Sequence, residues 1–398
     1  MMESIYHSLM IFQAAANDED LEVVGLIHEL RDRLRWRVSE PRRWFGSLRR
    51  LTLARAVQGS NSIEGYVASL DDVVAAMEGE DPLDANEETR LALEGYRDAM
   101  TYVLQLAKEP AVSVNESLLK SLHFMMLKYD LSKNPGRWRP GDIFVRRAVD
   151  GEVVYEGPNV ELVPDLIQEL LGDLDADDGP VLVRAAMAHL NLVMIHPFSD
   201  GNGRMARCLQ TLVLATETLS PEFNSIEEYL GRNTQSYYDI LGEVGQGSWH
   251  PQNDPRPWVR YCLTAHYRQA RTLLRRVQES EELWDALVVL VKRQGAPERS
   301  VGALFDAALG FRLRNATYRS VVQSSEGETI SEQTASRDLR TLVATGLLVP
   351  VGEKRGRFYV ATGNVLAQQA DIRIRRPPRE ADDPYALAAA SRQARFAI

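Results

Sequence analysis

The stretch from Pro180 to Ile195 constrains the fold of this chain more than any other. Most of its residues are apolar, and at helical spacing they occupy most faces rather than a single stripe. A helix that is apolar all round usually lies at the centre of a bundle. The next segment, Gly203 to Glu217, is also helical in pattern and apolar. The loop that begins at His196 therefore joins two core helices and should be held rigidly.

The composition is that of a globular protein with two or three domains. The 398 residues are 44% hydrophobic and 26% charged, and the net charge of −10 argues against nonspecific coating of nucleic acid. Two cysteines, Cys208 and Cys262, suit a reducing compartment. The start of the chain does not have the pattern of a secretory signal, and we find no run of eighteen apolar residues. We therefore expect a cytoplasmic protein without membrane contact.

Hydrophobic spacing predicts helices through most of the chain. The predicted helices outside the central pair cover residues 18–37, 43–57, 84–109, 114–127, 159–174, 233–241, 257–277, 281–294 and 331–343. Residues 143–149 and 153–155 flank Asp150-Gly151, a strong hairpin turn. We predict a short β-hairpin inserted into a helical protein.

The C-terminal part has the pattern of a winged helix, in which a helix precedes a hairpin with a basic tip. Strands predicted at 347–351 and 357–360 follow the helix at 331–343. Gln333, Thr334, Ser336, Arg337 and Arg340 would face DNA from the helix, and Lys354, Arg355 and Arg357 from the wing. Acidic residues are mixed through this region, so protein contacts or dimerisation remain open as its role.

We divide the chain into four parts. They are an N-terminal helical region (1–110), a central core (111–278), the winged-helix domain (279–363) and a tail (364–398). The tail alternates Arg, Pro, Asp and Ala, and we expect it to be mobile.

The run His196-Pro197-Phe198-Ser199-Asp200-Gly201-Asn202-Gly203-Arg204-Met205-Ala206-Arg207 contains the parts of a phosphate site. Gly201 and Gly203 allow backbone N–H groups to approach an anion at the start of a helix. Arg204 and Arg207 are three residues apart, so their planar guanidinium groups project near one another and suit phosphate oxygens.

Two other side chains of this run suit chemistry on a bound polyphosphate. Asp200 is a hard oxygen ligand for Mg²⁺ beside phosphates, and His196 could remove a proton from an attacking hydroxyl. The plainer interpretation is a capped helix start with solvated arginines and a core histidine. That interpretation requires six polar or glycine positions to coincide by chance.

At every position the run resembles the signature of the Fic family, His-x-Phe-x-Asp/Glu-Gly-Asn-Gly-Arg-x-x-Arg. The resemblance implies an all-α core with a β-hairpin flap. It also implies AMPylation, the transfer of AMP from ATP to a Ser, Thr or Tyr hydroxyl of a protein, including the enzyme itself. The hairpin at 143–155 would align the target segment by strand addition.

The same resemblance assigns roles to individual residues. His196 would be the general base and Asp200 the Mg²⁺ ligand. Gly201, Asn202 and Gly203 would form the anion hole, and Arg204 and Arg207 would contact the outer phosphates. Asn233, Tyr237 and Tyr238 are similar to the family's residues on the nucleoside side, although an aromatic pair on a helix is more often part of a core.

The segment Ser60-Asn61-Ser62-Ile63-Glu64-Gly65 resembles the inhibitory motif of the family, Ser/Thr-x-x-x-Glu-Gly/Asn. Ser60 and Glu64 share one helical face, and Gly65 suits a helix end. The resemblance implies that Glu64 pairs with Arg207 and obstructs placement of the γ-phosphate. The alternative is a surface glutamate at a helix C-terminus, where the helix dipole disfavours it.

Several functions remain open beside autoinhibited AMPylation. Glu64 could activate water and remove AMP, which would make the protein a de-AMPylating or bifunctional enzyme. The chain could also be a DNA-binding transcription regulator that only senses a nucleotide, but sensing needs no base, and His196 is present. Some relatives use UTP or other donors. A target protein, DNA and a second copy of the chain are the candidate partners.

Overall fold

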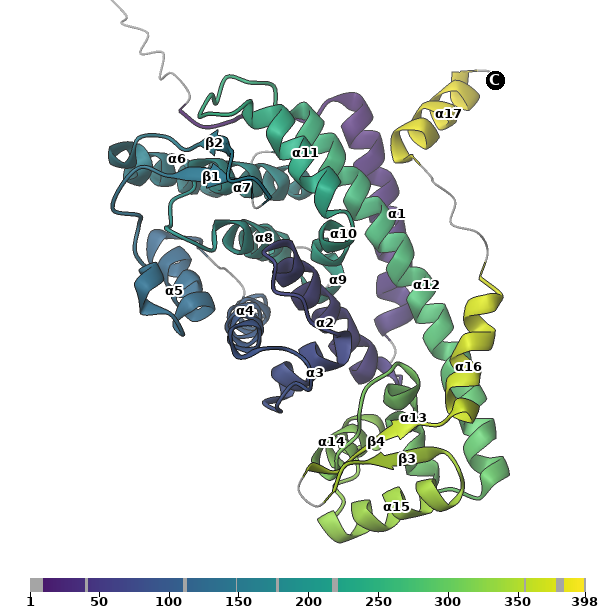
Figure 1. The fold of residues 1–398 in the computed structure, drawn as a ribbon. Coiled ribbons are helices and arrows are strands. Elements are labelled where there is room, and N and C mark those ends of the chain that lie inside the picture. Colours follow the sequence, from purple (N-terminus) through teal and green to yellow (C-terminus); the bar gives the residue numbers. More distant parts are fainter. Residues whose placement is uncertain are drawn as a thin grey trace, which may run out of the picture.

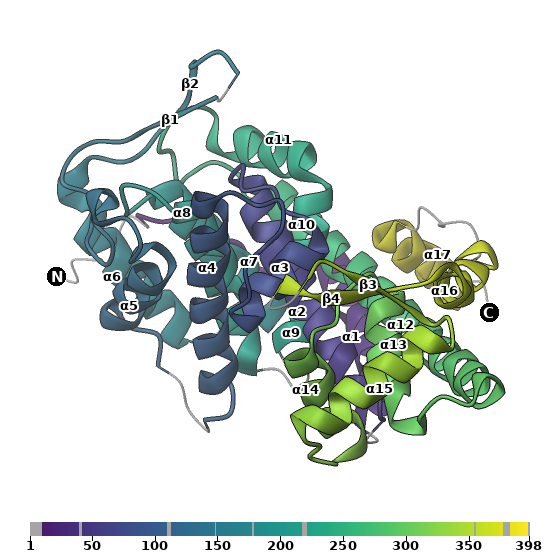
Figure 2. The ribbon, with the colours of Figure 1, turned by 60° about the horizontal axis from the view of Figure 1, so that its bottom comes forward.

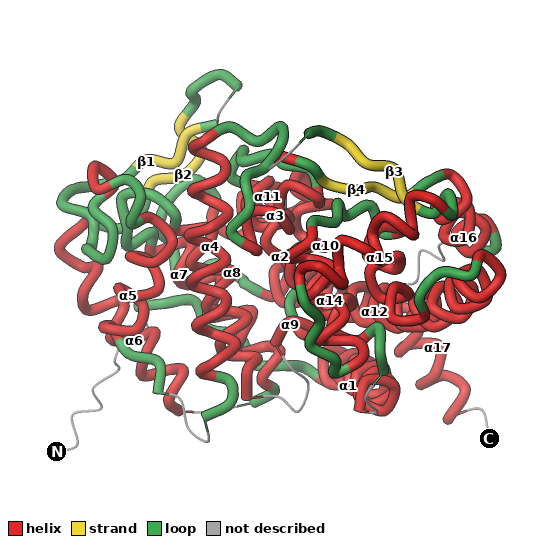
Figure 3. The backbone as a smooth tube through the Cα atoms, turned by 90° about the horizontal axis from the view of Figure 1, so that it is seen from below, coloured by secondary structure: helices red, strands yellow, loops and turns green. Residues whose placement is uncertain are grey.

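The computed structural model describes residues 10–39, 42–109, 113–147, 149–176, 179–216, 221–353, 356–376 and 383–396. This part of the chain is mostly helical, and its strands form two separate antiparallel hairpins (Figure 3). The expected all-α core with a short β-hairpin is confirmed. No helix of the described residues combines the length and hydropathy needed to cross a bilayer.

The helices and strands follow one another along the chain as shown in Figure 1. The helices are α1 (Asp18–Ser39), α2 (Phe45–Ile63), α3 (Leu70–Glu78), α4 (Glu87–Leu106), α5 (Glu116–Leu127), α6 (Val163–Ala176), α7 (Val181–Ile195), α8 (Asn202–Val213), α9 (Pro221–Asn224), α10 (Glu227–Arg232), α11 (Thr234–Gly245), α12 (Arg256–Gln294), α13 (Val301–Ala308), α14 (Asn315–Glu326), α15 (Glu332–Ala344), α16 (Gly363–Ile374) and α17 (Pro384–Phe396). The strands are β1 (Phe144–Arg146), β2 (Val153–Glu156), β3 (Leu348–Val351) and β4 (Phe358–Ala361).

α7 lies at the centre of the first core, as its apolar sequence predicts. Leu182, Leu190 and Ile195 are fully buried, and Trp258 on α12 donates its indole N–H to the Ala186 carbonyl oxygen at 2.7 Å. α8 packs along α7 and is buried over most of its length. The loop between these two helices is therefore anchored at both ends.

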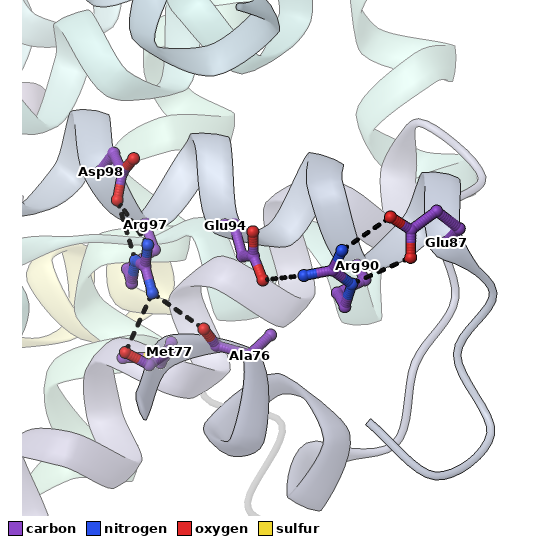
Figure 4. Close-up of polar contacts among 7 residues, drawn as sticks. All are labelled: Ala76, Met77, Glu87, Arg90, Glu94, Arg97 and Asp98. Atoms are coloured by element: carbon purple, nitrogen blue, oxygen red, sulfur yellow. Dashed lines mark hydrogen bonds and ion pairs between the residues drawn. The ribbon is translucent and has the colours of Figure 1, made fainter. Parts of the chain in front are cut away.

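α4 holds the end of α3 through the side chain of Arg97 (Figure 4). The guanidinium group donates to the carbonyl oxygens of Ala76 at 2.9 Å and Met77 at 3.2 Å. Carbonyls in the last turn of a helix lack partners within the helix, so a cation there supplies the missing donors. Because α3 also packs against α2, this contact braces the helix that ends next to Glu64.

One continuous helix, α12, replaces the two helices that we predicted over 257–277 and 281–294. Residues 278–280 contain no proline or glycine, and the apolar stripe continues beyond them through the buried residues Trp284 and Leu287. The helix therefore has no reason to end there. The domain boundary predicted between the two helices falls inside α12, which runs from the core into the C-terminal part (Figure 1).

A second core joins the two ends of the chain. It contains the C-terminal half of α12 together with residues of α13 to α16, and Leu34, Trp44 and Leu48 from the N-terminal helices also belong to it. The N-terminal region predicted as a separate part thus packs against both cores.

The tail, which we expect to be mobile, forms two helices in the residues that the structure describes. α16 buries Val365 and Ile372 in the second core. α17 packs on α1, and the Tyr385 hydroxyl donates to the Asp20 carboxylate at 2.7 Å. A few apolar anchors are enough to dock a short helix, and the polar composition around them concealed these anchors in the sequence.

The helix and hairpin predicted at the C-terminal end are present as α15 and β3–β4. Ser331 caps α15 by accepting the Thr334 N–H at 3.1 Å, and β3 pairs with β4 from Leu348 opposite Ala361. Of the residues that would face DNA from α15, Gln333, Arg337 and Arg340 are exposed, whereas Thr334 and Ser336 are half-buried. Arg357 is exposed beside β4, and Lys354 and Arg355 lie outside the described residues. The assignment as a winged helix remains a prediction.

Candidate active site

The loop between α7 and α8, which we call the motif loop, contains residues 196–201. It turns sharply where α7 ends. His196 adopts a left-handed backbone conformation with φ of 53°, and its N–H donates to the Leu192 carbonyl oxygen at 3.0 Å. Asn202, the first residue of α8, holds the turn with its side chain, which accepts the Phe198 N–H and donates to the Phe198 carbonyl oxygen, both at 2.9 Å. The Asn202 side chain thus shapes the loop, and the backbone at the start of α8 is left to face an anion.

The imidazole ring of His196 is fixed in orientation by its Nδ1 atom. Nδ1 lies 3.0 Å from the Val193 carbonyl oxygen, which can only accept a hydrogen bond. Nδ1 therefore carries the proton, and the lone pair is on Nε2. Burial is the largest influence on the ring and lowers its pKa below 6.5, against the opposing effects of the Val193 carbonyl and the Glu64 carboxylate. His196 is thus neutral and ready to accept a proton at neutral pH.

His123 supports the loop from α5, a role that the sequence analysis did not assign. Its ring stacks on Phe198 with centroids 3.7 Å apart and planes 7° from parallel. Nδ1 accepts the Gly136 N–H at 2.8 Å, so Nε2–H donates to the Asp200 carbonyl oxygen at 2.9 Å. Burial lowers the pKa of His123 to about 4, which keeps this donor and acceptor pattern intact at neutral pH.

Arg139 also supports the loop, by donating hydrogen bonds to its backbone carbonyl oxygens. Its side chain is 3% exposed, and Nε donates to the His196 carbonyl oxygen at 3.0 Å while Nη1 donates to that of Gly141 at 2.7 Å. Its backbone N–H also donates to the Pro197 carbonyl oxygen at 2.8 Å. The sequence analysis did not single out Arg139, because nothing local shows which distant carbonyls a guanidinium group will reach.

Replacing Arg139 with methionine should destabilise the protein by about 1.5–3 kcal/mol, since buried carbonyl oxygens lose a charged donor. Thermal melting followed by tryptophan fluorescence would measure the change. Arg137→Met, which alters an exposed arginine two residues away, is the matched control and should melt like the wild type. Equal melting of the Arg139 and Arg137 variants would contradict the role assigned to Arg139.

The phosphate-binding side chains predicted from the motif converge at the start of α8. Gly201 has φ of 77°, which favours glycine. Arg204 is 1% exposed, and its Nε and Nη1 atoms have no hydrogen-bond partner among the described residues. Its guanidinium group lies over the Tyr66 ring at 5.2 Å from the centroid. A buried guanidinium group without an acceptor is suited to a bound anion.

Asp200 precedes Gly201 in the same loop, and its carboxylate already has partners in this structure. Its carboxylate pairs with Lys133 at 2.9 Å and accepts the Gly201 N–H at 2.6 Å. These contacts outweigh its desolvation and lower the pKa of Asp200, so the side chain is ionised. The sequence did not indicate Lys133, which arrives from the turn after α5.

Glu64 reaches across from the end of α2 to the motif helix. Its Oε1 atom lies 2.6 Å from Nη2 of Arg207, whose Nε donates to the Ser60 hydroxyl at 2.8 Å. A Cβ atom on Gly203 would collide with Oε1 of Glu64, so glycine lets the carboxylate take this position. The pairing of Glu64 with Arg207, which was expected from resemblance, is present.

The three residues expected on the nucleoside side occupy different environments. Asn233 donates its side-chain amide to the Tyr229 carbonyl oxygen at 2.7 Å. Tyr237 is 1% exposed, and its hydroxyl lies 3.0 Å from Nε2 of His189. Tyr238 is half exposed and donates to the Ile63 carbonyl oxygen at 2.9 Å, next to Glu64. In this conformation Tyr237 supports the site from the core, and Tyr238 joins α11 to the end of α2.

The first hairpin projects from the helices beside the loop (Figure 2). Tyr155 anchors it by donating its hydroxyl to the Met194 carbonyl oxygen at 2.8 Å. β2 pairs with β1 on one side and forms a bridge with Ser248 through Glu156 on the other. β1 is thus an edge strand, and Phe144 on β1 and Val153 on β2 are each more than 40% exposed.

We compared the sequence of this chain with known protein families and with the sequences of known proteins. Residues 113–214 match the model described as the Fic/DOC family. A protein adenylyltransferase Fic from Nematostella vectensis is 26% identical over 250 residues, which are 61% of this chain and 53% of that protein. Protein adenylyltransferase fic-1 from Caenorhabditis elegans is 34% identical over 115 residues, which are 27% of this chain and 20% of that protein. The chain thus spans about half the length of the first relative and about a fifth of the second.

Solved structures share the fold. A Fic family protein from Desulfovibrio desulfuricans aligns with a TM-score of 0.57 at 21% identity, over 88% of this chain and 98% of that chain. Fic-1 from C. elegans aligns with a TM-score of 0.52 at 23% identity, over 66% of this chain and 73% of that chain. At these identities the likeness concerns the fold alone.

Proposed function

We propose, from the premise that this chain is a Fic-domain protein, that it transfers AMP from ATP to a hydroxyl group of a protein side chain. The observation that carries the proposal is the His196 ring, whose Nδ1 atom is fixed on Val193 so that Nε2 can accept a proton. The Arg204 guanidinium group at the start of α8, whose Nε and Nη1 atoms have no hydrogen-bond partner among the described residues, supplies positive charge for phosphate in the same loop.

In the proposed transfer, each step is assigned to particular residues. Nε2 of His196 takes the proton of the target hydroxyl, whose oxygen attacks the α-phosphorus of ATP. The bond to the β-phosphate breaks, and pyrophosphate leaves. Arg204 and the backbone N–H groups at the start of α8 neutralise the negative charge of the phosphates. Such a reaction depends on positioning and charge neutralisation rather than on a covalent enzyme intermediate.

Asp200 is the residue that would hold Mg²⁺. The ion takes one or two carboxylates together with phosphate oxygens, and Asp200 is ionised and 37% exposed. Lys133 occupies the carboxylate in this structure, so it would have to move aside or turn to a phosphate. Held by Asp200, the ion would supply positive charge against the phosphates of ATP.

We propose that the resting enzyme is autoinhibited by Glu64. Its carboxylate occupies Arg207, the arginine that the family resemblance assigns to the outer phosphates, and it lies against Gly203. A phosphate placed there would meet a carboxylate instead of a free guanidinium group.

The target segment would add to β1, the edge strand of the hairpin, where exposed Phe144 offers an apolar contact.

Two ATP preparations test the transferred group. Label on the α-phosphate should appear on protein when the enzyme is incubated with a lysate and Mg²⁺, whereas label on the γ-phosphate should not. Labelling from the γ-phosphate alone would replace AMP transfer with phosphate transfer. Labelling only from α-labelled UTP would keep the site but change the donor.

The pH dependence of transfer should reflect the lowered pKa of His196. The base is competent above this pKa and is lost as the pH falls through it, so the midpoint of the acid limb of kcat/KM, which reflects the free enzyme, should lie below pH 6.5. Initial rates between pH 5 and 8 would measure it. The limb should be absent from the residual activity of His196→Ala, and a midpoint above 6.5 would contradict the environment described for this ring.

A DNA-binding role for the C-terminal part is a second candidate. The exposed face of α15 with Gln333, Arg337 and Arg340 favours it. Retention of a specific duplex at moderate salt by the wild type, and its loss in an Arg337→Gln/Arg340→Gln variant, would support that role.

A further inference from the structure

A cavity lined by several arginines lies away from the motif loop, where α2, α10, α12 and α16 meet. Its volume is about 210 Å³, and none of the motif residues lines it. Six arginines from these elements surround it, namely Arg55, Arg232, Arg275, Arg276, Arg373 and Arg376. Residues so far apart in the sequence converge only through the tertiary structure.

The carboxylates at this cavity are shared among several arginines. Glu228 is contacted by Arg276 at 2.8 Å, by Arg232 at 2.7 Å and by Arg55 at 3.6 Å. Glu279, the acidic residue in the cavity wall, lies 2.6 Å from Arg376 and 3.7 Å from Arg275. Among the described residues that line the cavity, arginines outnumber carboxylates, and this gives its wall a net positive charge.

The contacts and the pKa of Arg55 show the effect of this positive charge most directly. Its side chain is 21% exposed, and its buried Nε atom has no hydrogen-bond partner among the described residues. Burial, followed by the nearby charges of Arg276, Arg232 and Arg373, lowers its pKa to about 10 despite the opposing effect of Glu228. A buried donor without an acceptor, held among like charges, is costly unless an anion occupies the space in front of it.

We propose that this cavity binds a small molecule that carries a di- or triphosphate group. Guanidinium groups match phosphate oxygens in pairs, and a chain of two or three phosphates can engage arginines from opposite walls. The recessed position of Arg55 and Arg276, which are 21% and 12% exposed, suits a compact anion better than a nucleic acid backbone lying across a surface. The site is distinct from the proposed catalytic site and does not depend on its activity.

Binding of inorganic triphosphate, measured by calorimetry at low salt, tests the site. The variant Arg373→Gln/Arg376→Gln removes two arginines from the α16 side of the cavity. Arg375→Gln changes the arginine between them, which lies outside the cavity and pairs with Glu282. We expect the double variant to bind at least tenfold more weakly in the cavity, and Arg375→Gln to bind like the wild type.

The motif loop would also bind triphosphate, so the two sites must be separated. Arg204→Gln weakens the motif loop and should leave binding in the cavity intact. Hydrogen exchange should show protection of residues 369–376 on addition of triphosphate in Arg204→Gln, and not in the Arg373→Gln/Arg376→Gln variant. Melting without ligand checks that the double variant is folded.

Two results would overturn the proposal. The first is protection confined to residues 196–207, which would place all binding at the motif loop. The second is equal weakening by Arg375→Gln and by the double variant, which would mean diffuse attraction to surface charge rather than a site.

Discussion

Replacing Glu64 with glycine is expected to raise the rate of AMP transfer by about ten- to a hundredfold. The substitution removes the carboxylate that pairs with Arg207 at 2.6 Å and lies against Gly203. A hydrogen bond between charged groups contributes about 1.5–3 kcal/mol, and each 1.36 kcal/mol is a factor of ten in rate if the phosphate must displace it. Transfer of label from α-labelled ATP to protein measures the change.

The backbone effect of the new glycine needs its own control. Ser62→Gly places a glycine at the same end of α2, where the Ser62 hydroxyl donates to the Gly59 carbonyl oxygen. This variant should transfer AMP at the wild-type rate. If wild type and Glu64→Gly label targets equally, Glu64 does not inhibit. If Glu64→Gly instead slows the removal of AMP from labelled protein, Glu64 serves the reverse reaction.

Replacing His196 with alanine in the Glu64→Gly background should lower the rate by about 10²- to 10⁴-fold, the usual contribution of a general base. ATP affinity should change little, because Nε2 acts on the target hydroxyl and the phosphates are held by α8. The readouts are the single-turnover rate and ATP binding by calorimetry.

An exposed histidine provides the control for this experiment. His250 lies in the turn before α12, outside the motif, and its ring contacts Gln252, so His250→Ala should keep the full rate. Loss of ATP binding together with activity in His196→Ala would mean that the ring organises the loop. Full activity in that variant would exclude His196 as the base.

Most helices could be predicted from local patterns. Asn115 and Ser331 cap their helices as the sequence indicates, by accepting a backbone N–H from the first turn. Such contacts span only a few residues, so neighbouring residues decide them. Contacts between distant residues could not be predicted in this way, and an example is Tyr385, which docks the C-terminal helix on Asp20, 365 residues earlier.

In the candidate site, too, local features could be predicted and contacts between distant residues could not. The chemistry of residues 196–207 could be predicted because a loop and one helical turn hold all of it, and backbone conformation and side-chain spacing are local properties. Three of its supports could not be predicted. His123 stacks under the loop, Arg139 clasps its carbonyls, and Lys133 pairs with Asp200.

Local patterns were enough to identify the residues that can hold phosphate and accept a proton, and the apolar helix pair that carries them. The meeting of α2 with α8, which lets Glu64 reach Arg207, depends on packing between distant parts of the chain. The same packing makes arginines from four elements face one cavity. The physical reason is that hydrogen bonds and ion pairs act over a few ångströms, so groups distant in sequence interact only after the cores have packed their helices together.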